Sequence, residues 1–309
     1  MILAITLNPA IDRVYFLDQL EIGEVNRPKS MTYTAGGKGL NVARVLKIMG
    51  ESVSAGGFVG GYNGKFITDS IKKLGITDRF IQIDDETRIC LNMTDRKTGK
   101  STEILEGGPT VSKEDCERFL NQYCEDLKTC DLVTISGSMP KGVPTDFYGE
   151  LIYIANEQGI KTIVDTSGES LEIAIDAKPT MVKPNKYELS KYLKQEIKTI
   201  PEIASALVRL KDSGIELPCV SLGKDGAIVH LSDGVYWFVS PDIPVVNTVG
   251  SGDSFIAGAA LGIVRKMSEV DTIKMAMACA TANTQFEKTG MVSKELVENY
   301  FNQIKYEKL

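Results

Sequence analysis

The stretch Thr-Val-Gly-Ser-Gly-Asp-Ser (248–254) leads directly into the apolar, small-residue segment Phe-Ile-Ala-Gly-Ala-Ala-Leu-Gly-Ile-Val (255–264). This pattern predicts a glycine turn that opens a buried helix, with Asp253 in the first helical turn. The free N–H groups of a helix N-terminus attract anions, and glycines at 250 and 252 allow a phosphate to approach the backbone. The segment therefore predicts a phosphate-binding helix start.

Asp253 is an unusual residue at such a place, because its carboxylate repels a phosphate. Its presence is explained if it takes a proton from an attacking hydroxyl. An anion site beside a base indicates phosphoryl transfer to an alcohol. The reaction does not require a raised pKa at Asp253, since an ordinary aspartate is already ionised at neutral pH.

The bulk composition is that of a globular α/β protein. The chain has 309 residues, which suits one large domain or two smaller ones, and its net charge of −6 argues against a general nucleic-acid surface. No apolar run approaches the ~18–20 residues needed to span a bilayer. Residues 1–7 are apolar but lack a basic leader, so we interpret them as a buried strand and not as a signal peptide.

Cysteine and histidine usage excludes several site chemistries. The six cysteines form no Cys-x-x-Cys pair and lie far in sequence from the single histidine, His230, so no zinc site is expected. Reduced thiols in a cytoplasmic protein are the preferred interpretation. His230 lies in an alternating segment, 227–236, and is interpreted as an ordinary residue at the edge of a β-hairpin.

From about residue 110 onward, strand-like and helix-like segments alternate. Strands are predicted at 132–137, 161–165, 180–185 and 218–223, and helices at 145–158, 186–193 and 203–210. This order predicts a mostly parallel sheet flanked by helices, with the site at the carboxyl ends of the strands. Polar residues recur at those ends, namely Asn8, Ser136–Ser138, Asp165, Lys183–Asn185 and Ser221–Gly223.

Two segments depart from this order. Residues 11–35 and 86–106 alternate with a period of two and contain turns at 23–24 and 97–100, which predicts antiparallel hairpins. We interpret them as a small sheet that projects over the strand ends as a lid. The alternative is that they are extra edge strands of the main sheet.

A second glycine-rich helix start occurs in Ala-Gly-Gly-Lys-Gly-Leu-Asn-Val-Ala-Arg-Val-Leu (35–46). Lys38 and Asn41 fall where the chain enters the helix, so a lysine and exposed N–H groups could together hold a phosphate or sugar hydroxyls. The alternative is a tight turn with a solvated lysine. Gly99-Lys100-Ser101 lacks the earlier glycine of a P-loop, and no complete Rossmann glycine pattern is present.

Val-Lys-Pro-Asn-Lys-Tyr-Glu (182–188) combines a strand end with a helix start. Asn185 and Glu188 are three residues apart, which places both on one helix face, where their oxygens suit Mg²⁺ directly or through water. The same spacing fits an N-terminal capping box, and spacing alone does not distinguish the two. Val-Ser-Leu-Gly-Lys-Asp-Gly-Ala (220–227) is a strand, glycine turn and strand that could follow a nucleotide.

Taken together, the motifs resemble those of the ribokinase-like (phosphofructokinase B) family of carbohydrate kinases. In chain order, the matching segments are 6–12, 36–44, 86–88, 136–140, 165–169, 183–188, 220–223 and 249–254. The match is nearest to the branch of 1-phosphofructokinase and tagatose-6-phosphate kinase, because of Asn-Pro-Ala-Ile-Asp (8–12) and Gly-Gly-Lys-Gly-Leu-Asn (36–41). The resemblance implies a single three-layer ribokinase-like domain with a small β-sheet lid.

The resemblance also implies roles for individual residues. Asp253 would be the catalytic base, and the backbone of Gly250, Ser251 and Gly252 would form the anion hole for the transferred phosphoryl group. The implied substrate-binding residues are Asp12, Gly37 and Asn41 for sugar hydroxyls, Lys38 and Arg88 for the phosphate already on the sugar, and Ser138. The implied nucleotide-binding residues are Lys183, Asn185, Ser221, Gly223, Gly226 and Asn283, with Glu188 organising Mg²⁺.

The expected activity is therefore ATP-dependent, Mg²⁺-assisted phosphorylation of a primary hydroxyl of a ketohexose phosphate, either fructose 1-phosphate or tagatose 6-phosphate. The alternatives are a kinase of a free sugar or nucleoside, and a non-catalytic binding regulator. Lys38 and Arg88 favour a phosphorylated substrate, and the retained Asp253 favours catalysis. Exposed edges of the lid strands would allow a homodimer.

Overall fold

The computed structural model describes residues 1–309 and contains two separate sheets. The larger sheet has ten strands in the order β14-β13-β12-β11-β10-β9-β8-β1-β4-β5. The run from β5 to β11 is parallel, and β12, β13 and β14 are added antiparallel at one edge. The predicted mostly parallel sheet is confirmed.

The central strands of the parallel part are buried on both faces, as their near-continuous apolar sequences require, whereas the edge strand β5 exposes Thr77, Arg79 and Gln82. In sheet order from one edge, the strands are β5 (Thr77–Ile83), β4 (Val53–Gly60), β1 (Ile2–Ile5), β8 (Leu132–Ser136), β9 (Lys161–Asp165), β10 (Met181–Val182), β11 (Leu217–Ser221), β12 (Ala227–Leu231), β13 (Gly234–Val239) and β14 (Lys305–Lys308).

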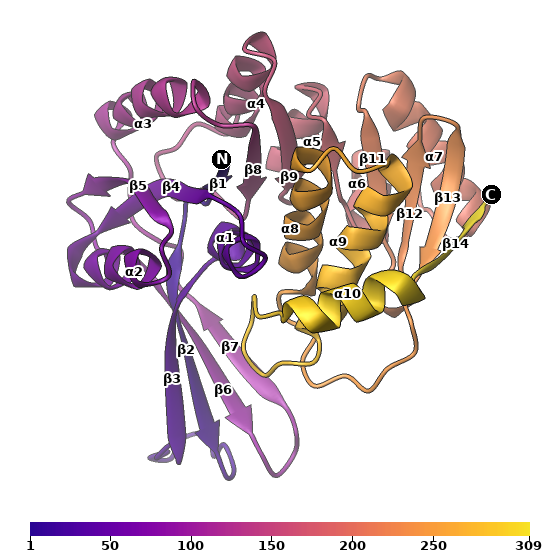
Figure 1. Ribbon diagram of the computed structural model, residues 1–309. Helices are drawn as coiled ribbons and strands as arrows, with labels where there is room; N and C mark the ends of the chain where they lie inside the picture. Colours follow the sequence, from indigo (N-terminus) through magenta and orange to yellow (C-terminus); the bar gives the residue numbers. More distant parts are fainter.

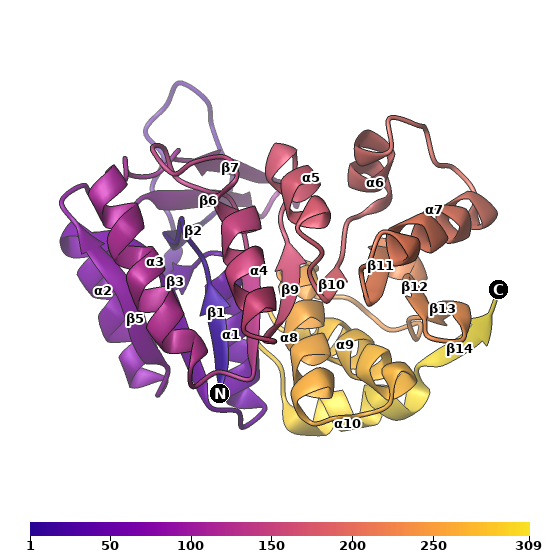
Figure 2. The same ribbon diagram turned by 90° about the horizontal axis from the view of Figure 1, so that it is seen from above.

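Helices cover both faces of this sheet, and each face has its own hydrophobic core (Figures 1 and 2). One face carries α1 (Lys38–Ile48), α2 (Gly61–Lys73), α8 (Ser251–Val264), α9 (Glu269–Asn283) and α10 (Lys294–Gln303). The other carries α3 (Lys113–Leu127), α4 (Phe147–Glu157), α5 (Glu169–Asp176), α6 (Lys186–Tyr192) and α7 (Ile200–Asp212). The three-layer prediction is thus confirmed. No helix is both long enough and apolar enough to cross a bilayer.

The two period-two segments form a small sheet of their own, with strand order β3-β2-β6-β7. Its strands are β2 (Ala10–Leu17), β3 (Ser30–Gly36), β6 (Ile89–Asp95) and β7 (Ser101–Leu105). Figure 1 shows this sheet extending away from the main body, below the large sheet. The alternative of extra edge strands of the main sheet is therefore wrong, and the hairpins β2–β3 and β6–β7 are antiparallel as predicted.

Three local predictions differ from the structure. The strand predicted at 180–185 is reduced to β10, because Asn185 is already the N-cap of α6 and Pro184 has no N–H to donate. The strand predicted at 218–223 ends at Ser221, because Gly223 has a positive φ of 62° and begins a short 3₁₀ turn, η1 (Gly223–Asp225). His230 lies in β12, which is paired on both sides and is not an edge strand.

Candidate active site

The N-terminus of α8 has the geometry that its glycines predict. Gly250 is the N-cap in the left-handed region, with φ 83° and ψ 0°, and α8 begins at Ser251. A Cβ atom at Gly250 would lie only 2.4 Å from the Thr289 side chain, so both conformation and space require glycine. The N–H groups of Gly250, Gly252 and Asp253 donate no hydrogen bond within the chain, whereas that of Ser251 donates to Thr248 O. The turn therefore offers free N–H donors to an anion.

Asp253 lies in the first turn of α8 with only 6% of its surface exposed. The Asn41 side chain, from the first turns of α1, donates from Nδ2 to Asp253 Oδ2 at 2.8 Å. Burial, and next the nearby Asp165 carboxylate, raise the pKa of Asp253 to about 6, although Asn41, Lys38 and Lys183 oppose this shift. A carboxylate with this pKa is a stronger base than an ordinary aspartate and is still ionised at neutral pH.

Asp165, the last residue of β9, holds two lysines from different parts of the chain. Lys38 Nζ lies 3.1 Å from Oδ2, and Lys183 Nζ lies 3.3 Å from Oδ1. Burial alone would raise the pKa of Asp165, but the two lysines lower it below its usual value. Asp165 therefore remains ionised between the two cations.

This ion group adjoins the α8 turn. A Cβ atom at Gly252 would lie 3.6 Å from Lys183 Nζ, which places the ammonium group beside the free N–H donors. Lys38 is the first residue of α1 and is half exposed, whereas Lys183 is buried. The structure thus brings two cations, a partly desolvated carboxylate and a helix N-terminus to the carboxyl edge of the large sheet, which is the arrangement that phosphoryl transfer requires.

The predicted sugar side lies where the small sheet joins the main body. Burial raises the pKa of Asp12, in β2, to about 6, against the opposing effects of Arg44 and Arg88. Gly36 packs directly on this carboxylate, since a Cβ atom there would lie 2.0 Å from Asp12 Oδ2. Gly37, with φ 107°, is the N-cap of α1.

Arg88 is anchored by backbone carbonyl groups on this side. Its Nε and Nη2 donate to Asn8 O at 3.2 and 2.9 Å, and its Nη1 donates to Glu106 O at 3.0 Å. A guanidinium carries five N–H groups, so two of them stay available for a phosphate. Ser138 follows β8, is exposed, and has its Oγ 3.5 Å from Asn8 Nδ2.

On the predicted nucleotide side, Asn185 and Glu188 form the capping box that the sequence allowed. Asn185 Oδ1 accepts from Glu188 N at 2.9 Å, and Glu188 Oε2 accepts from Asn185 N at 2.8 Å. Asn185 also forms a parallel bridge with Ser221 at the end of β11. The capping-box interpretation is confirmed, and Glu188 Oε1 stays outside it.

Two residues predicted to bind nucleotide have clear structural tasks. A Cβ atom at Gly226 would lie 1.9 Å from Phe238 O, so glycine is required by the neighbouring strand. Asn283 is fully buried, donates to Val249 O at 2.9 Å and accepts from Gly290 N at 2.9 Å. It thereby holds the segment that precedes the α8 turn, and the nucleotide contacts of both residues stay predictions.

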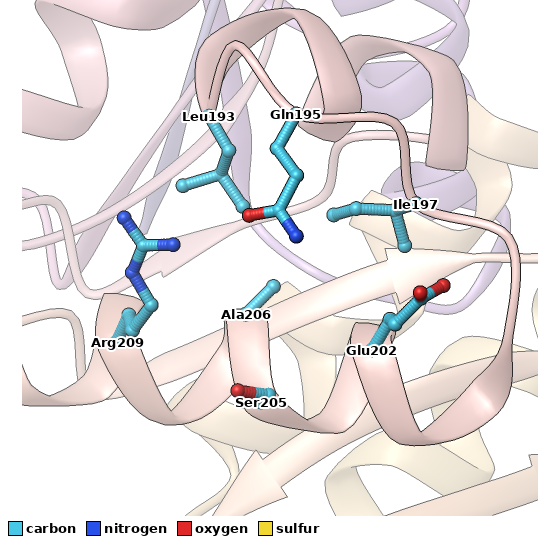
Figure 3. A pocket seen from close by; sticks show the side chains of 7 residues that line it. All are labelled: Leu193, Gln195, Ile197, Glu202, Ser205, Ala206 and Arg209. Atoms are coloured by element: carbon cyan, nitrogen blue, oxygen red, sulfur yellow. The ribbon is translucent and has the colours of Figure 1, made fainter.

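Two cavities lie beside α6. Figure 3 shows a small one of about 80 Å³, lined by seven residues of α7 and the loop before it, including Leu193, Ile197 and Arg209. None of the residues predicted for the site lines it. A larger cavity of about 290 Å³ between α5 and α6 is lined by Ser167, Gly168 and Glu188 among others, and so borders the predicted nucleotide side.

The sequence prediction of site residues omitted Asp165 and Arg44. Asp165 ends a predicted strand with a polar residue, a signal that was present but was given no role. Arg44 lies inside the glycine-rich motif 36–44, and its guanidinium donates to Asn41 Oδ1 at 2.9 Å. The pairing of Lys38 with Asp165 follows no local pattern, since the two residues are 127 positions apart. Asn41 and Arg44 are only three residues apart on α1, so their spacing is a local signal that is present in the sequence.

The fold and this site define a carbohydrate kinase. A family model described as the pfkB family carbohydrate kinase matches residues 3–295, and the chain belongs to this family. It is 41% identical over 307 residues to a tagatose-6-phosphate kinase of Staphylococcus epidermidis, covering 98% of each chain. The resemblance predicted from the sequence is therefore confirmed.

Solved structures agree with this assignment. The chain is similar to phosphofructokinase-2 from Escherichia coli in complex with potassium, with a TM-score of 0.91, 26% identity and 98% coverage of both chains. It is also similar to a protein from Thermotoga maritima described as a possible 1-phosphofructokinase, with a TM-score of 0.91 and 29% identity. That match covers 100% of this chain and 99% of the other.

Proposed function

We propose that this protein is an ATP-dependent kinase that phosphorylates a primary hydroxyl of a ketohexose phosphate, with Asp253 as the base. The observation that carries the proposal is the Asp253 carboxylate at the start of α8, beside the free N–H groups of Gly250 and Gly252 and next to Lys183. Asp253 takes the hydroxyl proton as the sugar oxygen attacks the γ-phosphorus of ATP. The helix N-terminus and the lysine stabilise the charge on the transferred group.

On the acceptor side, Asp12, Gly37 and Asn41 bind sugar hydroxyls, and Ser138 contributes from the β8 end. Lys38 and Arg88 bind the phosphate that the sugar already carries. For Lys38 this means exchanging Asp165 for a substrate phosphate, which its half-exposed side chain can reach.

On the donor side, ATP lies along Lys183, Asn185, Ser221, Gly223 and Gly226, with Asn283 beneath the α8 turn. The residues present fit Mg²⁺, because this ion is held by one or two carboxylates, waters and substrate phosphates rather than by a full protein cage. The capping box occupies only Oε2 of Glu188, so Oε1 can accept a hydrogen bond from a water of the ion. Mg²⁺ would supply charge neutralisation on the phosphates.

The 41% identical relative makes tagatose 6-phosphate the first substrate to test, with fructose 1-phosphate second. The experiment measures kcat and KM for ATP-dependent phosphorylation of both, of fructose 6-phosphate, and of free sugars and nucleosides. The proposal requires kcat/KM to be highest for a ketohexose phosphate. Highest kcat/KM for an unphosphorylated compound would overturn the substrate class, and no turnover on any acceptor would overturn the enzyme.

Turnover is expected to fall as the pH falls through about 6, because Asp253 must be ionised and its pKa is raised to about 6. The sign follows from the role, since a base is inactive when protonated. The measurement is kcat at saturating sugar phosphate and ATP between pH 5 and pH 9. If the acid limb of the profile, where kcat falls with falling pH, lay near the ordinary aspartate pKa of ~3.9, kcat would stay nearly constant down to pH 5, and this would contradict the buried base.

Arg88→Ala is expected to raise KM for the sugar phosphate at least tenfold, on the order of 1.4 kcal/mol, with a much smaller change in KM for ATP. Arg96→Ala is the matched control, because Arg96 is a small-sheet arginine that stacks on Phe16 at the far end of the strands. Equal increases in both KM values would show that Arg88 supports the fold and does not bind the phosphate.

Three further features stay predictions. Closure of the small sheet over the sugar would exclude water, which Asp253 could otherwise activate. Pairing of the small sheets between two subunits would cover β7, whose five residues are all exposed. A cytoplasmic location is the third.

A further inference from the structure

Arg44 has no role in the proposed function, yet its guanidinium joins three segments beside the base. Nη1 donates to Asn41 Oδ1 at 2.9 Å and to Thr289 O at 3.0 Å, and Nη2 donates to Ala35 O at 2.5 Å. These partners belong to α1, to the loop before α10 and to β3. Arg44 itself lies in α1, so it links the helix that carries Asn41 to β3 and to the loop that abuts the α8 turn.

The first consequence concerns the orientation of the Asn41 amide. A guanidinium only donates hydrogen bonds, so it fixes Oδ1 as the atom that faces Arg44. The amide NH₂ group then faces the opposite way, where it donates to Asp253 Oδ2. The reversed amide would set NH₂ against the guanidinium and oxygen against the carboxylate, and both contacts are repulsive.

We infer that Arg44 is a positioning residue for the base: it orients the Asn41 amide so that Nδ2 donates to the Asp253 carboxylate. The inference rests on the proposed function, in which Asp253 is the base. Without Arg44 the amide is free to rotate, and the carboxylate loses the one side-chain donor that stabilises its ionised form.

The hydrogen bond from Arg44 to Thr289 O supports the α8 turn from the loop after α9. A Cβ atom at Gly290 would lie 2.9 Å from Arg44 Nη1 and 3.1 Å from Asn41 Cα, so the loop after α9 passes very close to α1. Gly290 N donates to Asn283, which in turn donates to Val249 O just before the α8 turn. The bond from Arg44 to Thr289 O therefore fixes the loop on which that turn rests.

The other charged groups around Asp253 also affect its pKa, and so they bear on the expected effect of a substitution at Arg44. Lys38 of α1 and Lys183 after β10 favour the carboxylate, and Asp165 of β9 disfavours it. Burial lowers the pKa of Arg44, and the charges of the Asp12 and Asp253 carboxylates oppose that shift. Protonation of Asp12 affects binding of the free substrate, so kcat at saturating sugar phosphate is the quantity that reports on Asp253.

The test is Arg44→Met, with the pH profile of kcat as its readout. Loss of one hydrogen bond to a charged group is expected to move the acid limb upward by about one pH unit. A limb moved from 6 to 7 lowers turnover about fivefold at pH 6 and scarcely at pH 8.5. Arg44→Lys keeps the charge but lacks the planar fork, so a smaller shift in the same direction is expected.

Arg265→Met is the matched structural control. Arg265 is the C-cap of α8 and donates to Met49 O, at the C-cap of α1, at 3.0 Å and to Glu51 at 2.8 Å, and none of these partners belongs to the site. It should lower the melting temperature without moving the acid limb. If Arg44→Met lowers the melting temperature in the same way and leaves the limb in place, Arg44 is only structural and the inference is wrong.

A double-variant cycle tests the route through Asn41. In an Asn41→Ala background the acid limb is already shifted, and Arg44→Met is expected to add nothing. A full additional shift would mean that Arg44 acts through its charge alone, which overturns the inference. Failure of the proposed function would be seen separately. Near-normal turnover of Asp253→Asn would refute the assignment of Asp253 as the base, whatever the Arg44 variants show.

Discussion

Asp253→Asn is expected to lower turnover by about 10²–10⁴-fold, the usual contribution of a general base, while leaving ATP binding nearly intact. The replacement keeps the shape of the side chain and an oxygen that can accept from Asn41 Nδ2, so the α8 turn should be unchanged. The measurements are kcat with the preferred sugar phosphate and the Kd of ATP. Near-normal turnover would refute the assignment of the base.

The same variant is expected to be more stable than the wild type in the absence of substrates. The pKa of Asp253 is raised from 3.8 to about 6, so the folded state favours the protonated form and stability falls as the pH rises between these values. Above pH 6 the ionised carboxyl costs the folded state on the order of 2–3 kcal/mol, which an amide does not incur. Thermal unfolding at pH 7.5 measures this, and a lower melting temperature for Asp253→Asn would contradict it.

Asp165→Asn is expected to destabilise the protein by about 3–5 kcal/mol, the usual effect of removing one partner of a buried ion pair. Lys183 is buried and has Asp165 as its only carboxylate partner, so the amide would leave a desolvated ammonium group without a counter-charge. The pKa of Asp165 is lowered, so its contribution is present above the unfolded pKa and is lost only in acid, as the pH falls through the folded value. The loss should therefore be complete at neutral pH.

Urea unfolding at pH 7.5 measures this effect. Glu216→Gln is the control, because Glu216 pairs with Lys161 at 3.2 Å on the surface, where removing a partner should change little. Asp165→Asn should also move the acid limb of kcat to lower pH, since the Asp165 carboxylate raises the pKa of Asp253. Equal stability of Asp165→Asn and Glu216→Gln would show that Lys183 is solvated in the folded protein.

The sequence identified the elements whose pattern is local. The glycine turns before α1 and α8 were predicted because a positive φ and a helix start leave a signature within a few residues. The small sheet was predicted from period-two alternation, yet only the structure shows that β2 and β6 pair in parallel, across about 80 residues of chain. The β4–α2–β5 unit was not assigned, and its strand β4 carries the small-residue run Ser-Ala-Gly-Gly at 54–57, which is untypical of a strand.

For the site, too, only the features with a local sequence pattern could be predicted. Residues at strand ends were identified because parallel strands bring their carboxyl ends to one edge. The ion pairs of Asp165 and the contact from Asn41 to Asp253 depend on how distant strands and helix turns face one another, which no spacing records. The contact from Arg44 to Asn41 is local, since the two residues are three apart on α1. Asn185 and Glu188 illustrate a different difficulty. Their spacing of three residues fitted both a Mg²⁺ site and a capping box, and the structure shows that the capping box forms.

The junction at Gly37 has a mechanical consequence. Strand β3 ends at Gly36 and α1 begins at Lys38, so one residue separates the small sheet from the helix that carries Asn41. A tilt of the small sheet about this point must alter the direction of the first turn of α1, and with it the placement of Asn41 against Asp253. Occupancy of the sugar side is thus expected to be communicated to the base through rigid geometry, which would make idle ATP hydrolysis slow without any dedicated inhibitory element.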